Sequence, residues 1–170
     1  MTDRVGSDKI IILIGMPGAG KSTVGPLLAE KLGLSFVDTD AIIKKSIGRE
    51  LRDIVAEDGF KEFLNIQQNV VMAEKFKDCV IATGGSVVKS SILMKHLKGI
   101  GRIVYLKLDV NILEQRLEPD RRLARADGQT FRQILEEREP LYMKYAESII
   151  DCGEKTPEAI VCEIAGIYSK

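Results

Sequence analysis

Hydrophobic and polar residues follow two different periods along the chain. Uninterrupted short apolar runs are typical of strands buried on both faces, whereas apolar residues that recur every three or four positions are typical of helices with one buried face. The first pattern predicts strands at residues 9–14, 35–37, 79–82, 102–106 and 148–151. The second predicts helices at residues 22–32, 41–47, 51–57, 60–75, 90–97, 110–117, 130–145 and 156–168, with Pro140 as an interruption.

Strands that alternate with helices in this order predict an α/β fold with three layers. We expect a central, mostly parallel five-stranded sheet with helices on both faces. The 170 residues fit a single domain, residues 1–170, because a domain of this size buries roughly 70% of its unfolded surface. Ligands of such sheets bind beyond the carboxyl ends of the strands. Glycine-rich or acidic clusters follow three of the strands, at residues 15–22, 38–40 and 83–86.

Composition narrows the class of partner. The 25 basic side chains equal the 25 acidic ones, so the chain has no net basic field that would attract a nucleic-acid backbone or an anionic membrane. Aromatic residues make up 5% of the chain and tryptophan is absent, which disfavours a platform for stacking single-stranded bases. We therefore expect small-molecule partners, no nucleic acid and no membrane, and a monomer.

Cysteine usage and the N-terminal sequence suggest the compartment. Three cysteines without a CxxC pair are typical of a reducing environment rather than of a disulfide framework. Residues 1–8 are short and polar, and no later stretch approaches the roughly 20 apolar residues of a membrane span. A cytoplasmic location is expected.

The first glycine-rich cluster is the strongest motif of the sequence. Residues 15–22 read Gly-Met-Pro-Gly-Ala-Gly-Lys-Ser between a predicted strand and a predicted helix. Glycines let backbone N–H groups surround phosphates, the lysine reaches the β- and γ-phosphates, and the hydroxyl binds Mg²⁺. We predict that ATP and Mg²⁺ are the cofactors. The predicted nucleotide-binding residues of this segment are Gly15, Gly18, Ala19, Gly20, Lys21, Ser22 and Thr23.

Nucleotide binding alone leaves three classes of protein open. A GTPase switch is disfavoured because the chain contains no Asn-Lys-x-Asp segment that would read guanine. A phosphotransferase and a non-catalytic module that reports ATP to a partner remain. The acidic pair Asp38 and Asp40 favours the enzyme, since a binding module needs no carboxylate to orient an acceptor.

Several ordered motifs together resemble the shikimate kinases, a branch of the P-loop proteins related to nucleoside monophosphate kinases. The motifs are GMPGAGKSTVGPLLAEKLG, FVDTDAII, Asp58-Gly59, IATGGS, Arg-Ile-Val-Tyr-Leu, Asp-Arg-Arg-Leu at residues 120–123 and Glu-Arg-Glu-Pro-Leu-Tyr at residues 137–142. The similarity covers nearly the whole chain. It implies transfer of the ATP γ-phosphoryl group to a ring hydroxyl of shikimate, with helices at about residues 39–75 binding the acceptor.

The resemblance also implies roles for individual residues. Asp40 corresponds to the carboxylate that orients the acceptor hydroxyl, and Asp38 to the one that fixes magnesium-bound water, although either aspartate could instead be a helix N-cap. Lys21, Asp40 and Arg121 are the implied catalytic residues, Ser22 and Asp38 the implied metal-binding residues. Arg116 and Pro157 correspond to residues that flank the adenine. The implied substrate-binding residues are Asp40, Gly84, Gly85, Ser86 and Arg138.

A polar segment at about residues 118–129 is expected to form a mobile lid. Arg121 matches the arginine of the family that closes over the transferring phosphate, and Arg122 or Arg125 could take its place. The alternative for these arginines is a solvated run of charge. For Arg138 the alternative is a helix-surface arginine paired with Glu136 or Glu139.

The acceptor side departs from the pattern of the family at four positions. Leu64 and Gln67 replace an arginine that grips the substrate carboxylate and a glutamate that supports it, while Phe60 and Ser86 replace a glutamate and a glycine. Losing both members of a buried ion pair can be nearly neutral, whereas losing one costs roughly 3–5 kcal/mol. The paired change therefore indicates a rebuilt pocket. Shikimate is the leading acceptor, and another small hydroxy acid or polyol, such as a gluconate-like compound, is the alternative.

Overall fold

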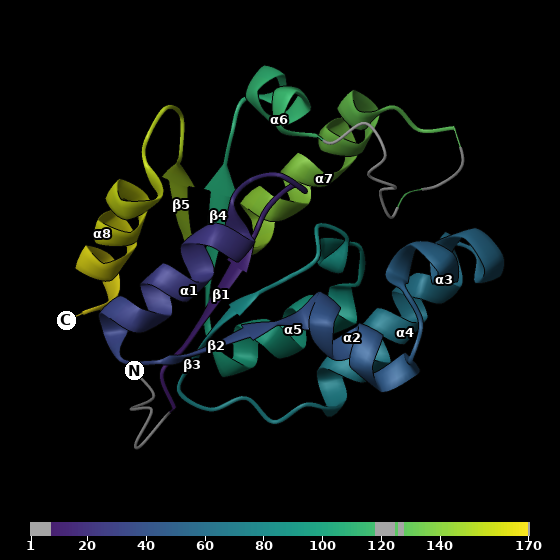
Figure 1. The fold of residues 1–170 in the computed structure, drawn as a ribbon, viewed down its shortest axis with the longest axis horizontal. Coiled ribbons are helices and arrows are strands. Elements are labelled where there is room, and N and C mark those ends of the chain that lie inside the picture. Colours follow the sequence, from purple (N-terminus) through teal and green to yellow (C-terminus); the bar gives the residue numbers. More distant parts are fainter. Residues whose placement is uncertain (1–7, 118–124, 126–127, 170) are drawn as a thin grey trace.

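A computed structural model of the protein describes residues 8–117, 125 and 128–169. Five parallel strands form one sheet in the order β2-β3-β1-β4-β5 (Figure 1), which confirms the predicted α/β class. The strands are β1 (Ile10–Ile14), β2 (Ser35–Asp38), β3 (Cys79–Ala82), β4 (Arg102–Lys107) and β5 (Ser148–Asp151).

The central strand β1 explains why the sequence run IIILI folds as it does. All five of its residues are buried, because β3 and β4 pair with its two edges and helices cover both of its faces. Branched side chains such as Ile12 suit a pleated surface that is packed on both sides. The strand ends at Ile14, so the glycine-rich segment begins at the carboxyl end of the central strand.

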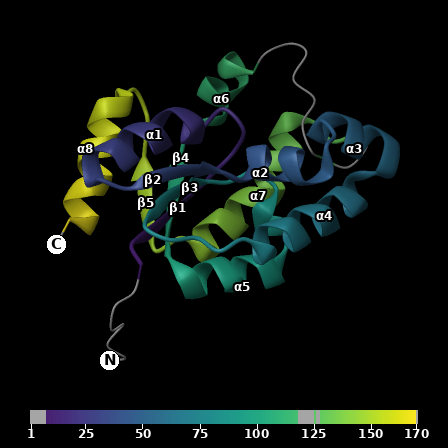
Figure 2. The same ribbon diagram turned by 60° about the horizontal axis from the view of Figure 1, so that its bottom comes forward.

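The helices form the outer layers of the fold. Helices α1 and α8 cover one face of the sheet, and α5 and α7 cover the other (Figure 2), whereas α2, α3 and α4 gather at the side where β2 ends. The helices are α1 (Lys21–Leu32), α2 (Thr39–Ile47), α3 (Leu51–Asp58), α4 (Phe60–Ala73), α5 (Ser91–Ile100), α6 (Val110–Arg116), α7 (Phe131–Tyr145) and α8 (Pro157–Tyr168), with a 3-10 turn η1 at Val87–Lys89.

The prediction that Pro140 interrupts its helix is wrong. Helix α7 runs through Pro140 without a break. Its buried residues Ile134, Arg138 and Tyr142 are spaced four apart and fix the helix to the core on both sides of the proline, and this packing outweighs the missing hydrogen bond. Most of the predicted lid, residues 118–129, lies outside the described residues.

Within residues 8–117, 125 and 128–169, no helix combines the length and the apolar character that crossing a membrane requires.

Candidate active site

The phosphate loop connects β1 to α1 in a conformation that needs glycine. Gly15 has a φ of 152°, and a Cβ atom added to it would lie 2.8 Å from the carbonyl oxygen of Leu106 on the neighbouring strand. The loop therefore passes too close to β4 to carry a side chain at this point. This approach also brings the loop next to the residues that follow β4.

Helix α1 begins immediately after the loop and leaves its first N–H groups available. Its N-cap is Gly20, which has no side chain to accept hydrogen bonds from these donors. The amino end of a helix carries partial positive charge and unpaired backbone donors, so it is a natural site for an anion. A phosphate group is the anion that this geometry suits best.

Lys21 lies folded over the loop that precedes it. Its Nζ atom donates hydrogen bonds to the carbonyl oxygens of Gly15, at 2.7 Å, and Met16, at 2.8 Å. The residue is only 8% exposed, so the ammonium group is held within the site rather than extended into solvent. A bound polyphosphate would offer this cation a stronger, charge-assisted partner than a carbonyl oxygen.

The predicted adenine-flanking residues occupy different positions. Arg116, at the end of α6, donates a hydrogen bond through Nη1 to the carbonyl oxygen of Gly18 at 3.3 Å and lines the cavity described below. Pro157 begins α8 and is not among the described residues that line the cavity. Gly15 and Ala19 of the loop are also not among the described residues that line the cavity.

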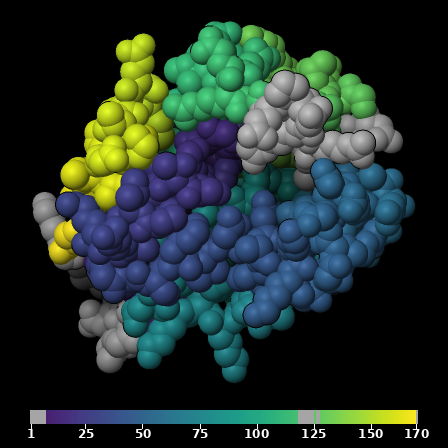
Figure 3. Space-filling model, viewed as in Figure 1, coloured from purple at the N-terminus to yellow at the C-terminus, as the bar shows by residue number. Residues whose placement is uncertain are grey.

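A cavity of about 970 Å³ extends from the phosphate loop to α3, α4 and the turn at residues 83–86. In the space-filling view, a hollow separates the purple phosphate-loop region from the blue α3, with teal residues at its floor (Figure 3). The cavity lies at the carboxyl ends of β1, β2 and β3, as the sequence predicts. It is large enough for a nucleotide phosphate chain and a small acceptor.

Asp38 and Asp40 enter this cavity with different surroundings. Asp38 is the N-cap of α2, and its Oδ1 atom accepts backbone hydrogen bonds from Asp40 at 2.9 Å and Ala41 at 3.4 Å. Of the two aspartates, Asp38 thus provides the cap. The Asp40 carboxylate approaches Gly84, where an added Cβ atom would lie 2.7 Å from Asp40 Oδ1. Glycine at residue 84 is needed to make room for that carboxylate.

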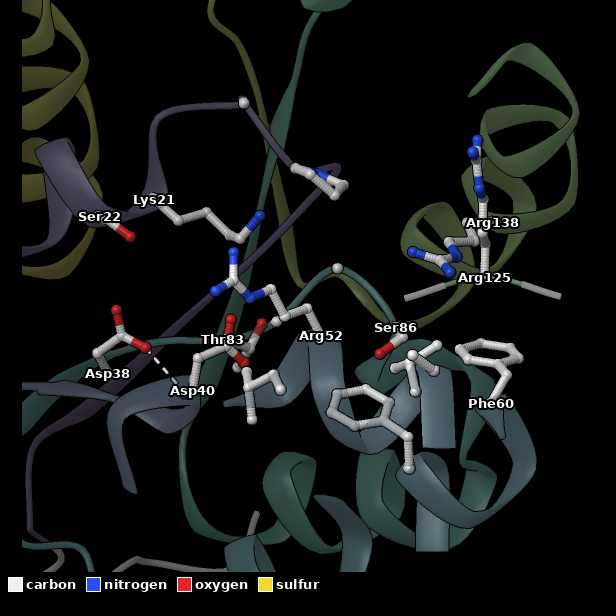
Figure 4. Close-up of a pocket in the computed structure, with 18 of the residues that line it drawn as sticks. Lys21, Ser22, Asp38, Asp40, Arg52, Phe60, Thr83, Ser86, Arg125 and Arg138 are labelled. Atoms are coloured by element: carbon white, nitrogen blue, oxygen red, sulfur yellow. Dashed lines mark hydrogen bonds between the residues drawn. The ribbon is translucent and has the colours of Figure 1, made fainter. Parts of the chain in front are cut away.

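Ser22 and Asp38 fit a magnesium site that is completed by nucleotide phosphates. Their side chains point toward one another across the start of the cavity (Figure 4). Within the described part of the chain, no group of three or more His, Cys, Asp or Glu side chains could hold a metal ion. Mg²⁺ usually binds through one or two protein oxygens together with phosphates and water, so one hydroxyl and one carboxylate are a suitable set.

Arg138 lies at the far end of the cavity, beside Gly85. Arg138 is 2% exposed, so the alternative that it is an arginine on the helix surface is wrong. Burial lowers the pKa of its guanidinium, although a hydrogen bond with Tyr142 works in the opposite direction. Phe60 lies with its ring 6.0 Å from the guanidinium carbon. The buried cation can bind an acidic group of a substrate through two parallel hydrogen bonds.

Tyr142 holds the turn that carries the acceptor-side glycines. Its hydroxyl donates a 2.6 Å hydrogen bond to the carbonyl oxygen of Gly85, and its ring stacks on Tyr105 of β4 at a centroid distance of 5.0 Å. Burial raises the pKa of the Tyr142 hydroxyl, so this hydroxyl stays protonated and remains a donor. Residue patterns gave this tyrosine no role, although it lies four positions after Arg138 on the same helix face.

Gln67 and Ser86 form a neutral hydrogen-bonded pair, and Gln67 is one of the two positions, with Leu64, at which the family resemblance implies an ion pair. The Ser86 hydroxyl donates to Gln67 Oε1 at 3.2 Å, and Gln67 is 1% exposed. Its Nε2 atom has no hydrogen-bond partner among the described residues and would lie 3.1 Å from a Cβ atom added to Gly84. Leu64 does not occur among the described lining residues. The acceptor side is therefore uncharged along α4.

The candidate lid arginines and one arginine of α3 differ in whether the structure describes them. Arg121 and Arg122, the first two candidates for the lid arginine, lie outside the described residues. Arg125 is described and lines the cavity. Arg52 on α3 also lines the cavity and points into it (Figure 4), and sequence patterns gave no indication of this. The only available signal was its place beside Leu51 on a helix with a buried face.

Comparison with known proteins identifies the family. A sequence model described as "Shikimate kinase" matches residues 17–167. The shikimate kinase of Thermodesulfovibrio yellowstonii is 37% identical over 167 residues, which are 95% of this chain and 96% of that protein. The shikimate kinase of Mycobacterium avium is 37% identical over 161 residues and 88% of each chain.

Solved structures agree with the sequence relatives. The structure described as shikimate kinase from Acinetobacter baumannii in complex with shikimate superposes with a TM-score of 0.81 and 30% identity, covering 96% of this chain and 94% of that one. Shikimate kinase from Aquifex aeolicus superposes with a TM-score of 0.77 and 26% identity, covering 95% and 99%. The chain belongs to the shikimate kinase family, and it is an ATP-dependent phosphotransferase that acts on an alcohol group.

Proposed function

We propose that this protein transfers the γ-phosphoryl group of ATP to the 3-hydroxyl of shikimate and gives shikimate 3-phosphate and ADP. The observation that carries the proposal is the placement of Asp40 and Arg138 in one cavity with the phosphate loop. A relative of the same fold was solved with shikimate bound. Shikimate carries both hydroxyl groups and a carboxylate. Asp40 can accept a hydrogen bond from a hydroxyl at one end of the acceptor half, and Arg138 can bind the carboxylate at the other end.

The donor half of the proposed site is built for the phosphates of ATP. The N–H groups at the start of α1 and the ammonium of Lys21 would hold the β- and γ-phosphates. Ser22 and Asp38 would hold Mg²⁺, which neutralises charge on the phosphates. Arg116 would lie beside the nucleotide, because it contacts the loop at Gly18.

The acceptor half would orient the hydroxyl. Asp40 accepts a hydrogen bond from the acceptor hydroxyl and takes its proton as the oxygen attacks the γ-phosphorus. The backbone of Gly84, Gly85 and Ser86 forms the adjacent wall, and Arg138 binds the carboxylate. Most of the rate enhancement of phosphoryl transfer comes from such positioning and charge stabilisation. Closure of a lid that carries Arg121 would exclude water from the reaction.

The test is production of ADP by the purified protein with Mg²⁺ and ATP, with and without shikimate. Strong stimulation by shikimate, with shikimate 3-phosphate identified by mass spectrometry, is the expected result. The variant Asp40→Asn should lower kcat by roughly a hundred- to ten-thousand-fold, whereas Asp8→Asn, a change at an exposed aspartate before β1, should not.

A panel of other acceptors decides the alternative. Gluconate and related hydroxy acids or polyols should stimulate ADP production much less than shikimate does. If one of them is clearly preferred while ATP binding is intact, shikimate is not the acceptor, and the neutral Gln67–Ser86 pair marks a changed substrate. ATP binding without any acceptor-dependent turnover would instead favour the non-catalytic module.

A further inference from the structure

Helix α3 forms one wall of the cavity. Leu51, Arg52, Val55 and Ala56 line the cavity from one face of the helix, and Glu57 and Asp58 line it at the carboxyl end of the helix. Among the described lining residues that α3 and α4 contribute, Arg52 is the cation. The other basic side chains of the lining come from the phosphate loop, from α6, from α7 and from residue 125.

Two ion pairs fix the orientation of this helix. Arg49, just before α3, pairs with Glu57 at 2.6 Å and with Asp58 at 2.5 Å at the opposite end of the helix. Ile54 is fully buried on the inner side. The direction of the Arg52 side chain therefore follows from a fixed helix rather than from a loose loop.

The Arg52 guanidinium is available for a ligand. Its ion pair is with the neighbouring Asp53, through Nε at 3.7 Å, and it makes no hydrogen bond with any described residue. In Figure 4 the guanidinium extends into the cavity toward Lys21 and Asp40, while Arg138 lies on the other side with Phe60 and Ser86. Arg52 thus faces the space between the donor and the acceptor groups.

We infer that Arg52 is a further catalytic residue, which binds the oxygens of the γ-phosphoryl group while that group passes from ATP to the acceptor. The inference rests on the proposed roles of Lys21 and Asp40 in the same transfer. In that step the bond between the γ-phosphorus and the β–γ bridging oxygen breaks, and a bond to the acceptor oxygen forms. ADP leaves with the electron pair of the broken bond, and the hydroxyl proton passes to Asp40.

The chemistry of a guanidinium suits this position. Its planar fork binds two oxygens of a phosphoryl group at once and stays charged at every physiological pH. Lys21, Arg52 and Arg116 are all cations that border one cavity, so a polyphosphate with several negative charges can pair with more than one of them. An arginine at this place on α3 adds positive charge where negative charge develops in the transition state.

The acceptor carboxylate is the competing ligand for Arg52, because it is also a planar oxyanion. Arg138 is the better candidate for that group, since it is almost fully buried and lies at the far end of the cavity beside Gly85. The two assignments predict different kinetics. A residue that binds the phosphoryl group in transit changes kcat, whereas one that binds the carboxylate equally in ground and transition states changes KM for the acceptor.

The experiment is steady-state and single-turnover kinetics of Arg52→Ala, with Arg132→Ala as the matched control. Side chains of both residues are exposed, at 66% and 53%, so neither change should affect folding, which thermal unfolding checks. We expect Arg52→Ala to lower the single-turnover rate and kcat by roughly 10- to 100-fold, with KM for the acceptor within about twofold. Arg52→Lys should retain part of the rate, and Arg132→Ala should match the wild type.

Two results would overturn the inference. An increase in KM for the acceptor at unchanged kcat would assign Arg52 to the carboxylate, and unchanged constants would make it a solvated surface arginine. This test of Arg52 is independent of the test that identifies the acceptor. If the wild-type protein prefers another hydroxy acid to shikimate, the same comparison with that acceptor still decides the role of Arg52, because every acceptor receives the same phosphoryl group.

Discussion

The two halves of the cavity differ in how closely they follow their family. On the donor side, the phosphate loop, Lys21 and the start of α1 keep every residue that the motif requires. On the acceptor side, Leu64 and Gln67 stand where the resemblance implies an ion pair, and Gln67 bonds to Ser86 instead. Both halves lie on the same sheet edge, so the difference is one of chemistry and not of fold.

This contrast shows which constraints are local. Phosphate binding depends on backbone N–H groups and on places where the backbone packs closely against a neighbouring strand, such as Gly15 against Leu106. Such positions tolerate few substitutions. Acceptor binding depends on side chains that meet from separate helices, so a change in one can be matched by a change in another. The four predictions that follow compare the two halves, beginning with the largest expected effect.

Lys21→Met should abolish transfer on the donor side. The ammonium is buried in the loop and reaches the phosphates in the proposed complex, so kcat should fall by roughly a thousandfold or more. Lys31→Met, on the exposed face of the same helix, is the control and should leave kcat unchanged. A variant at Lys21 that keeps a tenth of the activity would contradict the proposed role.

Gln67→Glu should destabilise the fold on the acceptor side. A carboxylate at this buried position would lack a cation, at a cost of about 3 kcal/mol in the free energy of unfolding. Burial would raise the pKa of the new carboxyl, so the loss should be largest above neutral pH and shrink as the pH falls and the group protonates. Urea unfolding at several pH values measures it.

Two further variants complete that test. Asn69→Asp makes a similar amide-to-acid change at an exposed position of the same helix and should cost little. Adding Leu64→Arg to Gln67→Glu should restore most of the lost stability, because the arginine lies one helical turn away. If the single and double variants are equally unstable, the two positions do not behave as a pair.

Arg138→Met should weaken binding of the acceptor more than binding of the nucleotide. Loss of a buried, charged hydrogen-bond donor costs about 2 kcal/mol, so KM for shikimate should rise by roughly 30-fold while KM for ATP stays within about twofold. Arg132→Met on the exposed part of α7 is the control. A rise in KM for ATP alone would place Arg138 on the donor side and remove the distinction between the halves.

Arg116→Ala should have the smallest effect. Its hydrogen bond to Gly18 is long, at 3.3 Å, and exposed, so KM for ATP should rise by about two- to fivefold without a change in KM for shikimate. Pro157→Ala offers a direct comparison, because Pro157 lies outside the cavity lining and should change neither constant. An equal effect at both positions would extend the nucleotide site to the start of α8.

Sequence patterns predicted the sheet well because burial on both faces leaves a clear mark. All five strands occur where apolar runs stand, and the three clusters at their carboxyl ends meet in one cavity. The ends of the helices were predicted less accurately than the strands. Helix α2 begins at Thr39 rather than at residue 41, because Asp38 caps it, and α5 continues to Ile100 rather than ending at residue 97.

The site could be predicted only where one segment supplies the chemistry. Residues 15–22 form such a segment, so the donor side follows from sequence alone. The Gln67–Ser86 bond and the placement of Arg52 depend on how separate helices pack, and no spacing along the chain records that packing. Pro140 illustrates the same limit, since its helix is held by buried side chains on either side of it.

The hydroxyl of Tyr142 has a consequence for how the molecule folds. It contacts Gly85, 57 residues earlier in the chain, and the sulfur of Met16, 126 residues earlier. Contacts of such long range form late, because the intervening chain must first be brought together. The two glycine turns of the cavity therefore receive their final shape only when α7 docks. During synthesis, a chain that has not yet reached α7 holds its ATP-binding motif but lacks a finished active site.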